Sequence, residues 1–152
     1  MKKYCIFLII FFLGCAATQT IPPEGKVIQE IIISSTFDEV WSKLIEIITD
    51  LNMPIESVEK VSGILTTSFV STTIERMAKI SYHPEVKNYA LFSNCRYKLN
   101  IFVKDLGNNK VKIKIKPHYE LSGQLMDRPW EIVAHSNGVL EKEIFDKMTL
   151  GE

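Results

Sequence analysis

Histidine and cysteine are the side chains of this sequence whose chemistry most often serves catalysis or metal binding. His83, His118 and His135 lie in separate segments, and none has a second ligand at the short spacing that metal motifs use. His118 is interpreted as a solvated strand residue. Cys95 would act as a nucleophile only beside a base, which no residue pattern supplies, so we interpret it as a small buried apolar residue. The sequence therefore predicts no catalytic residue, no metal site and no cofactor.

A polar pair near the end of the chain is the main candidate site. Residues 129–148 are predicted to form a helix. Its apolar stripe consists of Trp130, Val133, Leu140, Ile144 and Met148. Asn137 and Glu141 fall inside this stripe, where a polar pair needs buried partners or a wet cavity. We expect these two residues, with Trp41 and Trp130, to contact a ligand or partner. The alternative is that the Asn-Gly step breaks the helix and leaves both polar residues partly exposed.

A row of lysines marks a second candidate surface. Lys112, Lys114 and Lys116 alternate along one predicted strand, and Lys98 and Lys104 do so on its neighbour. Such a row would bind anionic headgroups or an acidic partner. The alternative is a solvated sheet face that discourages aggregation through sheet edges.

The start of the chain has the pattern of an export signal. Lys2 and Lys3 precede a charge-free apolar run over residues 4–13. A helix that spans a bilayer needs about 20 apolar residues, so this run is too short. The run ends in Gly14-Cys15, which resembles the lipobox of bacterial lipoproteins.

The lipobox resemblance implies that residues 1–14 are removed and that Cys15 becomes the lipidated first residue. Ala16 follows in place of the aspartate that retains lipoproteins in the inner membrane, which favours the outer membrane. Two or more acyl chains anchor a protein stably. The alternatives are an uncleaved anchor or an ordinary signal in which Cys15 is incidental.

The composition of the mature chain limits its function further. Without Lys2 and Lys3 it carries 16 basic and 18 acidic residues, a formal net charge of −2, and this balance does not suggest a nucleic-acid partner. With Cys15 lipidated, Cys95 is the one remaining thiol, so no intramolecular disulfide is expected. Residues 15–26 are predicted to be a flexible tether of about 35 Å when extended. Residues 27–150 suit one domain.

The periodicity of this domain predicts a two-layer α+β sandwich, with an antiparallel sheet covered on one face by two helices. The first helix spans about 36–52 and begins at the capping box of Thr36 and Glu39. The second is the C-terminal helix, and 71–94 is interpreted as an irregular, partly ordered insertion. Strands are expected at 27–34, 55–61, 64–70, 97–104 and 111–120.

Two segments carry a resemblance to a known family. Phe37-Asp38-Glu39-Val40-Trp41 at the first helix, and Pro54-Ile55-Glu56-Ser57 leading to Gly63-Ile64-Leu65-Thr66, resemble the domains of BamC-type outer-membrane lipoproteins. The resemblance implies a helix-grip-type α+β fold and an accessory role in β-barrel assembly without enzymatic activity. This chain has one domain where that family has two, and its tether is shorter.

Three hypotheses follow for the function. The first is a non-catalytic, lipid-anchored protein of the outer membrane that faces the periplasm and binds envelope proteins through a sheet edge, groove or helix face. The second is a periplasmic carrier, because a helix across a curved sheet can enclose an apolar cavity, here lined by Trp41 and Trp130. An enzyme such as a hydrolase is the third, but the sequence has no nucleophile elbow, paired carboxylates or metal motif.

Overall fold

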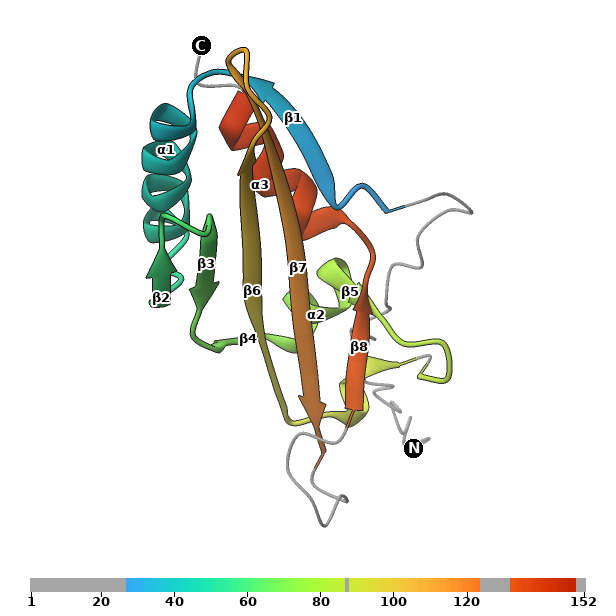
Figure 1. Cartoon of the computed structure of the whole chain (residues 1–152). Coiled ribbons are helices and arrows are strands. Elements are labelled where there is room, and N and C mark those ends of the chain that lie inside the picture. Colours follow the sequence, from blue (N-terminus) through green and yellow to red (C-terminus); the bar gives the residue numbers. More distant parts are fainter. Residues whose placement is uncertain (1–26, 87, 124–131, 150–152) are drawn as a thin grey trace, which may run out of the picture.

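A long antiparallel hairpin forms the centre of the fold in a computed structural model, which describes residues 27–86, 88–123 and 132–149 (Figure 1). Its two strands are β6 (Asn94–Asp105) and β7 (Lys110–Ser122), paired along their whole length. Shorter strands extend the sheet on both sides, in the order β2-β3-β6-β7-β8-β5, while β1 pairs with β7 and β4 with β6. The shorter strands are β1 (Glu30–Ser34), β2 (Ile55–Glu59), β3 (Ile64–Thr67), β4 (Val70–Thr72), β5 (Ser81–Tyr82) and β8 (Ile132–Ser136).

Helices cover one face of this eight-stranded sheet, as the α+β prediction required. They are α1 (Phe37–Asp50), α2 (Ile74–Ile80) and α3 (Val139–Thr149), with a short 3₁₀ helix, η1 (Tyr89–Leu91). Between the layers lies one continuous apolar core, to which β6 and β7 contribute alternate residues. None of the helices in the described part is both long and apolar enough to cross a membrane.

The first helix begins where the capping box predicted. The Glu39 amide donates to Thr36 Oγ1 at 3.4 Å, and the Thr36 amide donates to a Glu39 carboxylate oxygen at 3.0 Å. These two bonds satisfy amides that have no partner within the helix. The helix ends at Asp50, and Asn52 turns the chain with a φ of 53°.

The C-terminal helix is shorter than predicted. Among the described residues, 132–136 form strand β8, which pairs with Tyr119 to Leu121 of β7, and the helix begins only at Val139. The break lies at Gly138, whose φ of 87° is left-handed and ends the strand. Val133, predicted for the apolar stripe, is therefore exposed on the sheet, while Leu140, Ile144 and Met148 are buried as expected.

Residues 71–94, interpreted as an irregular insertion, contain β4, α2, β5 and η1. Thr73 caps α2 by accepting a hydrogen bond from the Arg76 amide at 3.1 Å. Met77, Ile80 and Tyr89 are fully buried, so this segment contributes to the main core.

Candidate functional site

A carboxyl group is fully buried at the start of α3. Glu141 has no exposed surface, and the Ser136 hydroxyl lies 2.6 and 2.8 Å from its two carboxylate oxygens. Ser136 is the last residue of β8, so the turn at Gly138 brings the hydroxyl back over the helix. Burial raises the pKa of Glu141 above its ordinary value, although the Ser136 hydrogen bond opposes this shift. Ionisation of Glu141 therefore costs more free energy in this site than in water.

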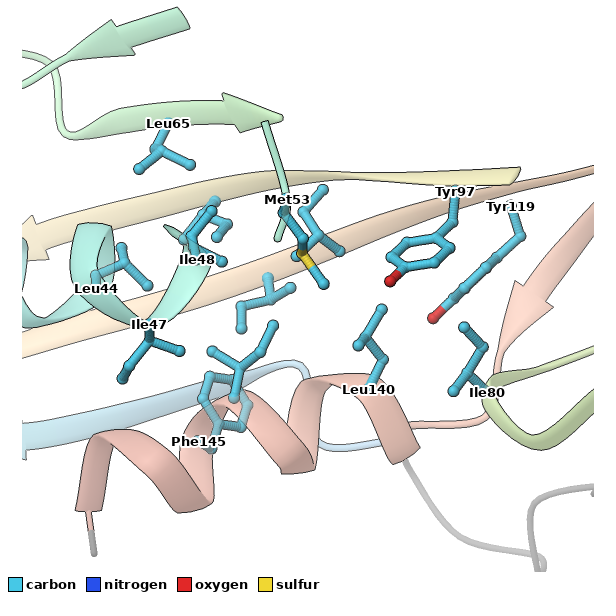
Figure 2. Close-up of a cluster of buried hydrophobic side chains, with 14 of the residues drawn as sticks. Leu44, Ile47, Ile48, Met53, Leu65, Ile80, Tyr97, Tyr119, Leu140 and Phe145 are labelled. Carbon is cyan, nitrogen blue, oxygen red and sulfur yellow. The ribbon is translucent and has the colours of Figure 1, made fainter. Parts of the chain in front are cut away.

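Two tyrosines of the central hairpin form a pair, and one of them, Tyr119, lies close to this carboxyl group. The rings of Tyr97 and Tyr119 are 6.1 Å apart, and both point from the sheet toward the helix layer beside Leu140 (Figure 2). Burial raises the pKa of Tyr119, and the nearby Glu141 charge raises it further. Tyr119 is fully buried, and its hydroxyl makes no hydrogen bond within the described part of the chain, although Ser136 lies near enough to lower its pKa slightly. A buried hydroxyl without a partner weakens the fold.

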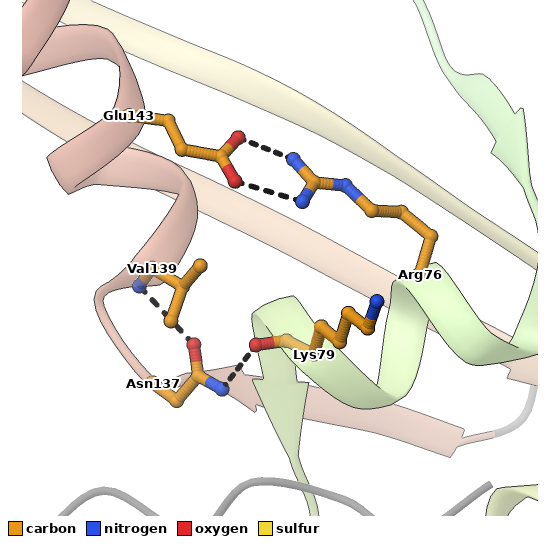
Figure 3. A network of polar contacts seen from close by, with 5 residues as sticks. All are labelled: Arg76, Lys79, Asn137, Val139 and Glu143. Carbon is orange, nitrogen blue, oxygen red and sulfur yellow. Dashed lines mark hydrogen bonds and ion pairs between the residues drawn. The ribbon is translucent and has the colours of Figure 1, made fainter.

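Polar contacts join α2 to α3 and to the turn before α3 (Figure 3). Arg76 forms a bidentate ion pair with Glu143, in which one N–O distance is 2.8 Å. Asn137 donates to the Lys79 carbonyl at 2.8 Å and accepts from the Val139 amide at 3.2 Å. These bonds fix the two helices relative to each other. Asn137 thus precedes the helix and caps it, contrary to its predicted place inside the stripe.

The predicted site residues are only partly brought together. Asn137 and Glu141 lie at the same end of α3, the first half-buried and the second fully buried. The Asn-Gly alternative is thus correct about the helix break, but Glu141 is not exposed. Trp41 of α1 packs in the hydrophobic core of the domain, and the centre of its ring lies 5.7 Å from that of the stacked Phe37 ring. Trp130 lies outside the described residues.

The carrier hypothesis called for an apolar cavity beside Trp41. The hollows lined by described residues lie elsewhere, at the ends of α1 and at the turns beside it, and they are open to solvent. Within the described ranges, no group of three or more histidine, cysteine or acidic residues could hold a metal ion. Cys95 is buried as predicted, and burial raises the pKa of its thiol to about 11, with a smaller contribution from Glu75.

The lysine row lies on the face of the sheet that the helices leave uncovered, here called the outer face. On three strands of the sheet the outer face consists of Glu30, Ile32 and Ser34 of β1, the even-numbered residues 96–104 of β6 and the even-numbered residues 110–120 of β7. On β6 and β7 these residues alternate with residues that are mostly buried. Seven of the outward side chains on these three strands are basic and two are acidic. The strand register adds Glu59 of β2 to the same face, which remains positive. The basic residues are Arg96, Lys98, Lys104, Lys110, Lys112, Lys114 and Lys116.

The acidic residues of the outer face neutralise only part of this charge. Glu30 lies 3.7 Å from the Lys112 ammonium and 4.0 Å from that of Lys114. Burial alone would raise the pKa of Glu120, but hydrogen bonds from His118 and Arg96 outweigh it and lower that pKa. His118 lies on the strand face of the lysine row, as interpreted from the sequence, but it is only partly exposed and bonds to Glu120.

Aromatic rings lie among the cations of the outer face. The Arg96 guanidinium is 4.1 Å from the centre of the Phe69 ring, and the Lys98 ammonium is 4.9 Å from it. The Lys116 ammonium lies 5.6 Å from the Phe102 ring, which is 37% exposed. These distances are typical of cation–π interactions, which keep the cations over the apolar rings.

Strand β1 forms an open edge of the sheet. It pairs with β7 on one side only, and among the described strands nothing pairs with its other side (Figure 1). The Ile115 amide donates to the Gln29 carbonyl at 2.8 Å. Because bonding alternates along antiparallel strands, the amides and carbonyls of Glu30, Ile32 and Ser34 point away from β7. They are available to another strand.

Sequence reasoning missed Ser136, Tyr119 and Phe69 as members of these two sites. Tyr119 lies on β7, far from α3 in sequence, whereas Ser136 of β8 is only five residues before Glu141 and reaches it through the turn at Gly138. Phe69 lies in the link between β3 and β4 and reaches the outer face only through the sheet topology. No protein-family model matches the chain, and no curated protein is significantly similar to it.

Proposed function

We propose that this chain is a non-catalytic, lipid-anchored accessory protein of the bacterial cell envelope that binds another protein through the open edge of β1. Its lipid would be carried by Cys15 in the outer membrane, with the domain in the periplasm. The partner would supply an extended segment that pairs with β1 as an added strand. The resemblance to BamC-type lipoproteins supports the same class of function.

The observation that carries this proposal is the unprotected state of β1. Natural proteins protect edge strands with charges, prolines, bulges or very short length. In β2, another edge strand, the register shifts between Ile55 and Ser57, and the strand itself contains two glutamates. The β5 strand has only two residues. In contrast, β1 has three consecutive isoleucines in an unbroken register, and Ile32 is 60% exposed.

A proline at position 32 tests the edge directly. Proline has no amide hydrogen and is tolerated on a strand where that hydrogen faces solvent. Ile32→Pro therefore removes one outward donor without breaking a bond to β7. Ile32→Thr is the matched control, because it removes most of the apolar side chain and keeps the amide.

The measurement is purification of the lipidated chain from its native membrane in mild detergent, followed by mass spectrometry of everything retained. We expect stoichiometric envelope proteins with the wild-type chain and with Ile32→Thr, and their loss with Ile32→Pro. Equal retention by all three chains would exclude the β1 edge. A chain that retains only an apolar small molecule would establish the carrier instead.

A further inference from the structure

We infer that the outer face of the sheet binds the anionic phospholipid headgroups of the membrane that anchors the chain. This goes beyond protein binding at β1, and it rests on the lipid anchor of the proposed function. The occupant is the membrane surface itself, recognised through its negative charge.

The charge of the outer face is complementary to such a surface. No carboxylate among the described residues lies within ion-pair distance of Lys98, Lys104 or Lys116. The cations follow both long strands, and they do not converge on one point as they would to bind a single carboxylate or phosphate. A diffuse row of ammonium groups suits a plane of lipid headgroups, with which each cation interacts separately.

The apolar side chains of this face suit the same surface. Ile32 is 60% and Phe102 is 37% exposed, each next to lysines on neighbouring strands. Lysine stems can lie along apolar surface while their ammonium groups reach the headgroups. Isolated apolar residues of this kind can enter the boundary between headgroups and acyl chains.

The opposite side of the molecule would be repelled by an anionic membrane. Apart from the buried Glu141, helices α1, α2 and α3 together contain seven acidic and five basic residues. The charge separation between the helix layer and the outer face therefore orients the domain as well as attracting it. The tether over residues 16–26, at most about 35 Å long, would keep the domain within reach of its own membrane.

Lysine footprinting of the lipidated chain in vesicles tests this inference. One set of vesicles is neutral phosphatidylcholine, and the other contains about 30% phosphatidylglycerol to give a negative surface. A water-soluble acylating reagent labels exposed lysines, and mass spectrometry reads the rate at each position. Lys79 of α2 and Lys147 of α3 are exposed controls in the same molecule.

We expect labelling of Lys98, Lys104 and Lys116 to slow by roughly threefold or more in the anionic vesicles, and to recover at about 0.5 M salt. Labelling of Lys79 and Lys147 should be unchanged. Equal labelling in the two vesicle types would overturn the inference. So would protection that occurs in native envelope vesicles but not in pure lipid, because the face would then bind an acidic protein.

Charge reversal separates the outer face from general electrostatic attraction. The double variant Lys98→Glu/Lys116→Glu should abolish the protection of Lys104, the third lysine followed in this experiment. The variant Lys79→Glu/Lys147→Glu should preserve the protection of Lys104. Loss of protection in both variants would overturn the inference.

Two further outcomes distinguish this inference from the proposed function. Lys98→Glu/Lys116→Glu should abolish the lysine protection and leave the envelope proteins retained at the β1 edge unchanged, because neither lysine belongs to β1. A chain retained by anionic vesicles but not by neutral ones would support the outer face and refute the anchor. Failure to be retained by either would overturn both.

Discussion

Glu141 is the residue at which sequence and structure agree on an unusual environment, and its pKa makes the environment testable. Because burial raises its pKa in the folded state, the unfolded chain releases the proton at lower pH than the folded chain does. Its contribution to stability is therefore fully present below the unfolded pKa. It is lost as the pH rises through the folded pKa, by at most about 1.4 kcal/mol per pH unit.

Glu141→Gln removes this titration and keeps the shape of the side chain. We expect the free energy of unfolding of Glu141→Gln, relative to wild type, to increase as the pH is raised from acid toward neutral. Urea denaturation at a series of pH values measures this difference. Glu46→Gln, at an exposed position of α1, is the control for the loss of one carboxyl group. A constant difference between Glu141→Gln and wild type would contradict the assignment.

The sequence identified Glu141 because a carboxyl group stands out at a position where the helical period predicts an apolar residue. It could not identify Tyr119 as a neighbour, because Tyr119 reaches Glu141 only through the fold of the sheet. Ser136 is five residues before Glu141 and was missed because the turn at Gly138, not a continuous helix, joins them. Trp41 was proposed for a ligand site on composition alone, and in the structure it packs in the core. A polar residue that violates a pattern was thus more informative than an aromatic one that satisfies it.

Among the elements, the first helix and the central hairpin were predictable because local signals agree there. The capping box and a 14-residue amphipathic run define α1, and strict alternation defines β6 and β7. Residues 132–136 were misassigned to a helix because a short apolar run satisfies both periodicities. The Asn-Gly step was the correct boundary signal, and the register with β7 decided the outcome.

Two glycines in turns allow the cost of a close approach to be separated from that of backbone conformation. Gly63 precedes β3 with a φ of 68°, and a Cβ there would lie 1.9 Å from the Val103 carbonyl oxygen. Gly107 lies between β6 and β7 with a φ of 79° and no heavy atom within 4 Å of such a Cβ. The backbone strain is comparable in the two cases, but only Gly63 is sterically enclosed.

We expect Gly107→Ala to lower the free energy of unfolding by about 1 kcal/mol, the usual cost of a left-handed alanine. Gly63→Ala should lower it by roughly 3 kcal/mol or more, since the Val103 backbone must also move. Chemical denaturation of the two variants gives both values. Equal losses would show that contact with β6 does not fix the turn before β3.

At the scale of the whole molecule, the sheet separates two tasks. Its inner face supplies the core, whereas its outer face and the β1 edge are the surfaces for which we propose contacts with other molecules. The sequence predicted this division on the hairpin, where lysines alternate with apolar residues. It could not predict that β1 would be an unprotected edge, because edge position depends on the pairing of strands distant in sequence.

One continuous core implies that the chain opens as a unit, and Cys95 can report on this. Cys95 pairs with Thr72 of β4 and Leu121 of β7, and its thiol donates a hydrogen bond to the Thr72 carbonyl at 3.0 Å. Only the thiolate reacts with alkylating reagents, and a pKa of about 11 leaves little thiolate at pH 8. Alkylation should therefore require exposure of the core.

We expect Cys95 to become alkylated over the same range of urea concentration in which circular dichroism detects loss of helix and sheet. Mass spectrometry of the peptide that contains Cys95 distinguishes this thiol from others in the chain. Coincident midpoints would mean that β4, α2 and the central hairpin unfold together. Alkylation well before the loss of secondary structure would instead mean that residues 71–94 open independently, and the segment would then be a mobile cover over the core formed by the rest of the sheet.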